Sequence, residues 1–379
     1  MKDLLERKSV HGREQPVVLV VDDEAAVLAS ARRLIRRSHP DWTVLMAKSV
    51  DEAVDQLRTC SPWVVIADKL MPGREGTGLL EQVRQSHPQA LRVMLTGDTS
   101  TSALLEGAAA AHLIFAKPYD PEAIAAILDR GACIRRLPIN AEVKHAIGSL
   151  NQLPVVSTTF TQLSLELSRD EVSLERVVEL VEADQALTAR LLQLANSAFF
   201  GFSTEAVSIR EAVVRLGSEL IRAIVLALEL FHPNQDVQTE CTQTRRFGLA
   251  RKVAEHALKL GRELGLERHE RDRVFVAGLL HNIGTLVELE LSTFHCANTE
   301  ESAIGAYLLT LWGFNNEQVR LVLHMRFPSR ASQADRALAV LHLAWIQETE
   351  ARHAELLDRA FLSGVGLQLN VDGGLEPVG

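Results

Sequence analysis

The sequence predicts a doubly wound α/β domain with a five-stranded parallel sheet, followed by an all-α domain. From Pro16 to about Arg130, short apolar runs alternate with amphipathic stretches of helical period. After Arg130 the strand-like runs stop, and helical periodicity continues to about Ser363. The chain has 379 residues, 47% of them hydrophobic and 23% charged, which is enough for two packed cores.

The five apolar runs of the first part are rich in Val, Leu and Ile, as expected for strands that are covered on both faces. They are Val17–Val21, Thr43–Ala47, Trp63–Ala67, Arg92–Leu95 and Leu113–Ala116. Helical stretches such as Ala25–Arg37 and Val50–Thr59 separate them. Strands that alternate with helices form parallel sheets with right-handed crossovers, and the active groups of such sheets lie at the carboxyl ends of the strands.

Helices separated by Gly and Pro residues are expected in the second part. The predicted helical stretches are Ser173–Asn196, Ile209–Phe231, Thr242–Leu264, Glu270–Leu289, Glu300–Leu311, Asn316–His324 and Gln333–Ala351. We therefore divide the chain into an α/β domain (15–130), a partly helical connector (131–150), an all-α domain (151–363) and a mobile tail (364–379). The tail is rich in glycine and has no helical pattern.

Composition excludes several classes of protein. The formal net charge of −9 argues against broad binding to nucleic acid. The four cysteines (Cys60, Cys133, Cys241 and Cys296) lie far apart, which indicates neither a disulfide framework nor a cysteine zinc site. The N-terminal residues have no apolar core typical of a signal peptide, and no apolar run is long enough to cross a membrane. A cytoplasmic protein is expected.

Polar residues follow the predicted strands in a fixed order. Asp22 and Asp23 come after the first strand, Asp68 after the third, Thr96 closes the fourth and Lys117 ends the fifth. Clustered carboxylates need a cation, and oxygen ligands suit Mg²⁺. A carboxylate beside Mg²⁺ can accept a phosphoryl group, and lysine and hydroxyl donors can stabilise the added charge.

The segments that carry these residues are VVLVVDDE, VVIADKLMPGREG, RVMLTG and FAKPYDP. Together they resemble the receiver domain of two-component response regulators, which has a flavodoxin-like fold. The resemblance implies Mg²⁺-dependent phosphorylation of Asp68 by a sensor histidine kinase or a small phosphodonor. It assigns Mg²⁺ to Asp22, Asp23, Asp68 and the Leu70 carbonyl, and contacts with the phosphoryl group to Thr96 and Lys117.

One position departs from the receiver pattern. Receivers usually carry an aromatic residue three places before the lysine, whereas this chain has Ile114 there and Phe115 one place later. The departure puts the usual aromatic rotamer switch in question, but the phosphorylation chemistry does not depend on it.

The second part resembles the HDOD family, the output-domain branch of the HD metal-dependent phosphohydrolases, over about 138–345. The blocks that carry the resemblance are ELVEADQALTARLL, ANSAFFG, SIREAVVRLG, GLLHNIG and IGAYLLTLWGF. HDOD domains are helical and often lack catalytic metal ligands.

An HD metal site needs imidazoles and a carboxylate, because neutral amides bind divalent ions poorly. The resemblance places the ligand positions at Phe247, His281, Asn282, Glu301, His324 and Met325. Since Phe and Met offer no suitable ligand atom, we interpret this as a degenerate HD site with no cofactor. Asn282 would then satisfy backbone groups at a helix contact.

Three functions follow from these patterns. The favoured one is a response regulator in which phosphorylation of Asp68 controls a non-catalytic module that binds a protein partner or self-associates as a homodimer, with neither nucleic acid nor membrane as partner. The alternatives are a metal-dependent phosphohydrolase or cyclic-dinucleotide phosphodiesterase, and a module that binds a nucleotide without hydrolysis. An unforeseen metal site formed by His256, His269, His295 and Glu301 is a further alternative.

Overall fold

The computed structural model describes residues 15–150, 153, 157–169, 171–202, 204–229, 237–290, 300–333, 335–349, 356–369 and 375–377. It divides into two compact units. The first unit comprises Met1–Gln152 together with Asn196–Ser203 and Thr310–Gly313, and the second comprises Leu153–Ala195, Thr204–Leu309 and Phe314–Gly379.

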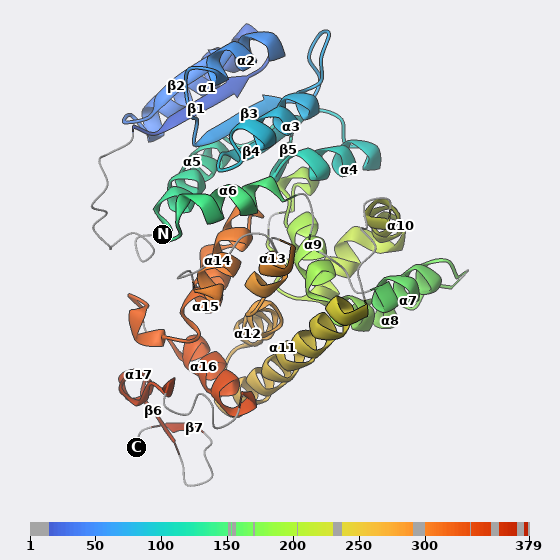
Figure 1. The fold of residues 1–379 in the computed structure, drawn as a ribbon, viewed down its shortest axis with the longest axis vertical. Helices are drawn as coiled ribbons and strands as arrows, with labels where there is room; N and C mark the ends of the chain where they lie inside the picture. Colours follow the sequence, from blue (N-terminus) through green and yellow to red (C-terminus); the bar gives the residue numbers. More distant parts are fainter. Residues whose placement is uncertain are drawn as a thin grey trace. The chain divides into compact units, whose positions relative to one another are not determined.

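A five-stranded sheet with the order β2-β1-β3-β4-β5 forms the centre of the first unit (Figure 1). All neighbouring strands are parallel. The strands are β1 (Val17–Val21), β2 (Thr43–Ala47), β3 (Val64–Asp68), β4 (Leu91–Thr96) and β5 (Leu113–Ala116). Every residue of β3 and β4 is buried, as the apolar runs predict for strands covered on both faces. The predicted doubly wound sheet is confirmed.

Six helices accompany this sheet: α1 (Ala25–Ser38), α2 (Val50–Leu57), α3 (Gly76–Ser86), α4 (Thr101–Ala110), α5 (Pro121–Arg136) and α6 (Ala141–Ser149). Helix α1 packs against α5, whereas α3 packs against α2 and α4, so helices cover both faces of the sheet. Because the strands are parallel, their carboxyl ends lie along one edge, and the polar residues that follow them gather there.

The segment 131–150, predicted to be a partly helical connector, contains the end of α5 and all of α6. Both belong to the first unit, where buried Lys144 of α6 donates from Nζ to the carbonyl oxygen of Arg135 (2.7 Å). The later segment 196–203 also belongs to this unit, and Ser197 Oγ donates to the carbonyl oxygen of Ile114 (2.9 Å). The first unit thus extends beyond the predicted boundary at residue 130.

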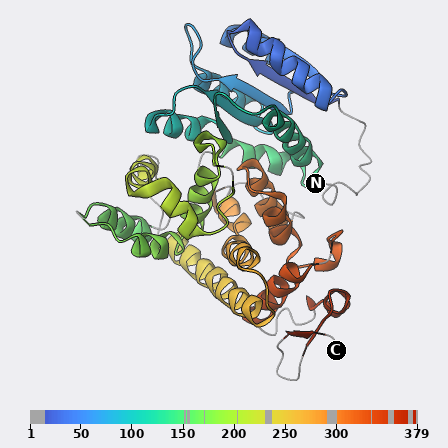
Figure 2. The ribbon, with the colours of Figure 1, turned by 180° about the vertical axis from the view of Figure 1, so that it is seen from behind.

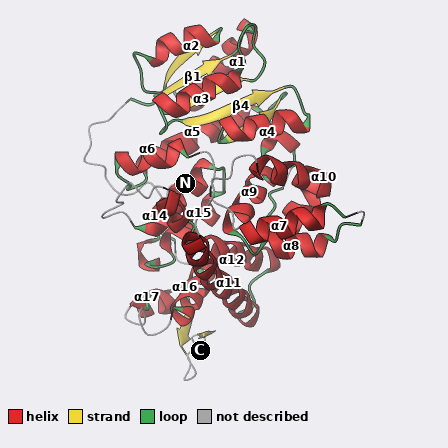
Figure 3. Cartoon of the chain, turned by 45° about the vertical axis from the view of Figure 1, so that its right-hand side comes forward, coloured by secondary structure: helices red, strands yellow, loops and turns green. Residues whose placement is uncertain are grey.

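The second unit is mostly helical, as predicted (Figures 2 and 3). Its helices are α7 (Ser157–Leu167), α8 (Leu174–Val181), α9 (Gln185–Ala195), α10 (Ile209–Glu229), α11 (Val237–Glu263), α12 (Arg268–Leu280), α13 (Gly284–Glu290), α14 (Glu301–Leu311, whose last two residues belong to the first unit), α15 (Asn316–His324), α16 (Arg336–Glu348) and α17 (Arg359–Gly364). Helix α11 packs against both α12 and α16. None of the helices in the described parts of the chain has the length and apolarity that crossing a membrane requires.

The prediction of one continuous helix over Glu270–Leu289 is wrong. The chain forms α12 and α13, separated by the turn His281–Ile283. Backbone hydrogen bonds tighten this turn, and the Thr285 hydroxyl donates to the Asn282 carbonyl oxygen (2.8 Å). Gly284 then starts α13 so close to α14 that a Cβ atom there would lie 2.2 Å from the carbonyl oxygen of Glu301. The apolar periodicity continues through this turn and therefore conceals it.

The segment 364–379, predicted to be a mobile tail, also contains regular structure. Strands β6 (Leu367–Leu369) and β7 (Leu375–Pro377) pair as a two-stranded antiparallel sheet. The pairing joins Leu367–Leu369 to Leu375–Pro377, and neither helical periodicity nor glycine content indicates such a pairing.

Candidate functional site

Four of the residues predicted at strand ends meet at the carboxyl edge of the first unit's sheet. Asp22, Asp68 and Thr96 are buried, with 1%, 7% and 0% of their surface exposed. Lys117 follows β5 and reaches both carboxylates. The edge is therefore a largely desolvated site in which charge interactions are strong.

Lys117 is the central group of this site. Its Nζ lies 2.8 Å from Oδ2 of Asp22 and 2.6 Å from Oδ1 of Asp68. Burial alone would lower the pKa of Lys117, but its ion pairs with Asp22 and Asp68 outweigh burial and raise it. The ammonium therefore stays charged and holds the two carboxylates together.

The surroundings of Asp68 raise the pKa of its carboxyl group. Burial raises its pKa, the hydrogen bond and charge of Lys117 oppose this change, and the neighbouring charge of Asp22 adds to it, so the pKa lies above its ordinary value. Its Oδ2 accepts from the backbone N–H of Leu70 (3.2 Å). Because the Asp22 and Asp68 carboxylates lie close together, an additional positive charge beside them would be favourable.

Two carboxylates, the type of ligand that suits Mg²⁺, meet at this edge. Asp22 and Asp68 converge through Lys117, whereas Asp23 is exposed. Among the described residues, no three His, Cys, Asp or Glu side chains form a ready metal cluster. Mg²⁺ does not need one, because it keeps several waters and binds proteins through one or two carboxylates.

The approach of α3 to Asp68 requires a glycine. A Cβ atom on Gly76 would lie 1.9 Å from the carbonyl oxygen of Asp68. The backbone N–H of Gly76 also donates to the carbonyl oxygen of Lys69 (3.0 Å). Gly76 therefore fixes the turn that presents Asp68.

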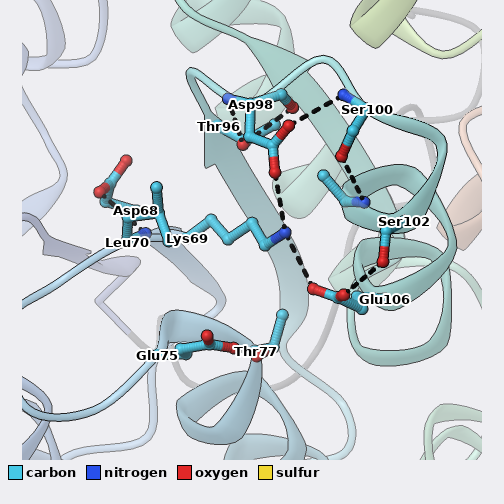
Figure 4. A network of polar contacts seen from close by, with 11 residues as sticks. Asp68, Lys69, Leu70, Glu75, Thr77, Thr96, Asp98, Ser100, Ser102 and Glu106 are labelled. Carbon is cyan, nitrogen blue, oxygen red and sulfur yellow. Dashed lines mark hydrogen bonds and ion pairs between the residues drawn. The ribbon is translucent and has the colours of Figure 1, made fainter.

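A second group of charges on the same unit was not predicted from the sequence (Figure 4). Lys69 follows Asp68 directly, and its buried ammonium forms ion pairs with Asp98 and Glu106. The one signal for it in the sequence is a lysine placed immediately after a fully buried strand.

In the second unit, the predicted degenerate HD positions lie on α11, at the α12–α13 turn, at the start of α14 and at the end of α15. His281, Asn282 and Met325 are buried, whereas Phe247 and His324 are half-buried. The structure also shows the hydrogen bonds and ion pairs of His281, Asn282 and Glu301.

Asn282 binds backbone and amide groups. Its Oδ1 accepts from Nε2 of Gln185, which also donates to the carbonyl oxygen of Leu279. Its Nδ2 donates to the carbonyl oxygen of Arg246 (3.2 Å). Asn282 thus links the α12–α13 turn to α9 and α11. Gln185 was not predicted, and its only signal is a polar residue within an apolar helical block.

Arg326 places positive charge beside His281. Its Nη2 lies 2.6 Å from Oε2 of Glu301, and its guanidinium lies over the Trp345 ring at 5.5 Å from the centroid. Burial and, to a smaller extent, the charge of Arg326 lower the pKa of His281, the hydrogen bond with the Gly278 carbonyl oxygen opposes both effects, and the resulting pKa is about 4. Oε1 of Glu301 is buried and has no hydrogen-bond partner among the described residues.

The other histidines considered as metal ligands form separate contacts. His256 Nδ1 lies 2.9 Å from Oε1 of Glu348, and His269 Nδ1 lies 3.4 Å from Oε2 of Glu267. His295 lies outside the described residues. In the part of the chain that the structure describes, these groups do not form a metal cluster with Glu301.

Comparison with protein families gives three matches. The response regulator receiver domain matches residues 18–129, the HDOD domain matches residues 153–302 and the HD domain matches residues 250–360. The HDOD and HD matches overlap over residues 250–302, which include α12 and α13.

Similar proteins include the DNA-binding transcriptional regulator NtrC of Klebsiella pneumoniae, 28% identical over 171 residues, which are 42% of this chain and 34% of NtrC. The hydrogenase transcriptional regulatory protein HoxA of Cupriavidus necator is 32% identical over 111 residues, which are 29% of this chain and 22% of HoxA. The chain therefore spans about a third or less of the length of these relatives.

Among solved structures, the signal receiver domain of an HD domain-containing protein from Pseudomonas fluorescens Pf-5 aligns with 31% of this chain and 95% of its own. The sequence identity is 23% and the TM-score 0.30. The family matches show that the chain contains an N-terminal response regulator receiver domain, with which the five-stranded parallel sheet agrees, followed by regions that match the HDOD and HD domains.

Proposed function

We propose that the receiver domain is phosphorylated on Asp68 in the presence of Mg²⁺ and that phosphorylation controls a non-catalytic HDOD module. The observation that carries the proposal is the position of Lys117 Nζ, 2.8 Å from Asp22 and 2.6 Å from Asp68. A buried carboxylate that is held beside a cationic donor is suited to accept a phosphoryl group.

In the transfer step, one carboxylate oxygen of Asp68 forms a bond to phosphorus. The bond from phosphorus to the nitrogen of a phosphohistidine, or to the oxygen of an acyl phosphate, breaks, and the donor leaves with the electron pair. Lys117 stays protonated and offsets charge on the phosphoryl oxygens. Thr96, buried at the end of β4, would donate its hydroxyl proton to one of them.

Mg²⁺ would be held by Asp22, Asp23, Asp68 and the Leu70 carbonyl. When bound, it would supply positive charge that offsets the repulsion between these carboxylates. The raised pKa of Asp68 supports this assignment, because part of the shift comes from the charge of Asp22. The phosphodonor would be a sensor histidine kinase or a small phosphodonor in the cytoplasm.

The output would act through contacts with a protein partner or through self-association. Asn282 and Glu301 stand where the resemblance expects ligands, and they bond instead to Gln185, Arg246 and Arg326. A guanidinium beside a neutral imidazole disfavours a divalent cation at the same place.

A metal-dependent phosphohydrolase is a second candidate function. The HD match over 250–360 favours it, as does the buried Oε1 of Glu301, for which the described residues offer no hydrogen-bond partner. A nucleotide bound without hydrolysis would use the same helices. The presence of a bound transition metal would distinguish a metal-dependent phosphohydrolase from the proposed non-catalytic module.

The phosphorylation proposal predicts the behaviour of three proteins. With acetyl phosphate and Mg²⁺, we expect the wild-type chain to gain one phosphoryl group in intact-mass measurements and to lose this gain when a chelator removes Mg²⁺. Asp68→Asn should gain none, because the amide cannot act as the nucleophile. Asp55→Asn, which changes an exposed acid on α2, is the matched control and should behave as wild type. A phosphoryl gain by Asp68→Asn would refute the assignment.

A further inference from the structure

Lys69 is a buried lysine in the turn that follows Asp68. Only 4% of its surface is exposed, and Figure 4 shows its side chain extending away from the Asp68 carboxylate toward α4. Its Nζ lies 2.8 Å from Oε2 of Glu106 and 3.4 Å from Oδ2 of Asp98. Its backbone N–H donates to the Leu95 carbonyl oxygen (2.8 Å), so both ends of the residue are held.

The ammonium of Lys69 is charged in this environment. Burial lowers its pKa, but the hydrogen bonds and charges of Glu106 and Asp98 outweigh burial and raise it. Hydrogen bonds also lower the pKa values of Glu106 and Asp98. The largest contribution comes from Lys69 for Glu106 and from Ser100 for Asp98. Three charges are thus arranged between the Asp68 turn and the middle of α4.

Asp98 connects this arrangement to Thr96. The Thr96 hydroxyl accepts from the backbone N–H of Asp98 (3.0 Å) and donates to the Asp98 carbonyl oxygen (3.2 Å). Its single proton is therefore engaged with the β4–α4 loop (residues 97–100). A hydroxyl has one proton, so donating it to a phosphoryl oxygen would release the Asp98 carbonyl.

The loop and α4 are joined by further hydrogen bonds. Asp98 Oδ1 accepts from the backbone N–H of Ser100 (2.9 Å), and Ser100 Oγ caps α4 by accepting from the N–H of Ala103 (3.2 Å). Ser102 Oγ donates to Oε1 of Glu106 (2.8 Å). A displacement of Asp98 is therefore transmitted to the first turn of α4.

We propose that Lys69 is a positioning residue that couples the phosphorylation state of Asp68 to the β4–α4 loop and α4 through Asp98 and Glu106. The inference rests on the proposed phosphorylation of Asp68. When Thr96 turns its hydroxyl toward the phosphoryl group, the loop shifts and the longer contact, from Lys69 to Asp98, breaks, whereas the shorter contact with Glu106 persists. This route does not use an aromatic rotamer, which Ile114 cannot provide.

Hydrogen–deuterium exchange of the full chain tests the coupling, with phosphorylation followed by intact mass in the same samples. In wild type we expect the amides of residues 97–106 to exchange about fivefold faster after treatment with acetyl phosphate and Mg²⁺, since one partly exposed ion pair has been lost. In Lys69→Met, which is still phosphorylated, exchange should be fast from the start, with no further response. Lys48→Met, which alters an exposed lysine of the same unit, should respond as wild type.

Asp98→Asn gives a second test on a more exposed residue, in case a buried methionine at position 69 prevents folding. It keeps an oxygen for the Ser100 N–H but removes the charge that Lys69 binds, so it should also lose the exchange response. If either variant is phosphorylated and still shows the wild-type response, the coupling role of Lys69 is refuted, because a purely structural lysine would change the baseline only. If wild type gains no phosphoryl group, the proposed function fails and the coupling fails with it.

Discussion

The residues around Asp68 have two kinds of role in the receiver site: some supply charge, and others fix the backbone geometry. Lys117 supplies charge to the carboxylates, while Lys69 directs its charge toward α4. Gly76 supplies no chemistry at all, but its missing side chain lets α3 start against the backbone of Asp68. The position of Asp68 thus depends on a residue that sequence reasoning assigned no role.

Gly76→Ala should destabilise the chain and impair phosphorylation. The new Cβ would lie 1.9 Å from the Asp68 carbonyl oxygen, so α3 or the strand end must shift. We expect a loss of about 1 to 3 kcal/mol in the free energy of unfolding, as for other overpacked positions. Urea unfolding and intact mass after treatment with acetyl phosphate and Mg²⁺ measure the two effects.

Gly78→Ala is the matched control for this change. Gly78 lies in the same helix, and a Cβ atom added to it would meet no other described part of the chain within 4 Å. Alanine is the better helix former, so this variant should gain about 0.5 to 1 kcal/mol. Equal stabilities of the two variants would contradict the steric explanation.

At the scale of elements, the sequence predicts the strands best. The run Val17–Val21 matches the observed strand β1 because a strand buried on both faces needs a continuous apolar run that its polar flanks delimit. The turn at His281–Ile283 was missed because apolar residues continue on either side of it. Gly284, which begins α13 directly after the turn, lies close to the backbone of α14, and local periodicity does not record such a contact.

The candidate sites, like the helices and strands, could be predicted only in part from the sequence. The ends of the parallel strands could be brought together from topology alone, so Asp22, Asp68, Thr96 and Lys117 were predicted to meet. The partners of Asn282 and Glu301 could not be predicted, since Gln185 and Arg326 reach them from distant parts of the sequence. Contacts between helices depend on side-chain packing, which no sequence period specifies.

The α12–α13 turn should make stability depend on pH. The pKa of His281 is lowered to about 4, whereas an unfolded histidine titrates near 6.5. Between these values the unfolded chain binds more protons, so the contribution is fully present above about pH 6.5 and is lost as the pH falls toward 4. We expect a loss of about 3 kcal/mol from this group across that window.

Urea unfolding at about pH 7 and about pH 5 measures this contribution, with His281→Gln as the comparison. The glutamine does not titrate, so the difference in stability between wild type and the variant should shrink or reverse at the lower pH. His112 and His342, whose pKa values are also lowered, chiefly by burial, are present in both proteins and cancel. A difference that is the same at both pH values would contradict the assignment.

At the scale of the whole molecule, the two units carry different chemistry on the same chain. The receiver edge gathers carboxylates around one lysine, and the proposed Mg²⁺ would bind there through few protein ligands. At the HD positions a neutral imidazole, an amide and the Glu301 carboxylate lie together. The carboxylate is already paired with a positive charge, the guanidinium of Arg326. Metal should therefore associate reversibly with the first unit and not be retained by the second.

Elemental analysis of the purified full chain after gel filtration should accordingly find well below one transition-metal ion per chain. Mg²⁺ held by a few carboxylates and waters is expected to be lost during the same step. Near-stoichiometric zinc, manganese or iron would contradict the non-catalytic interpretation, above all if His281→Ala removed it. In that case the buried Oε1 of Glu301 would be a metal ligand and Arg326 would have to move aside, and a metal-stimulated phosphodiesterase assay would become the next measurement.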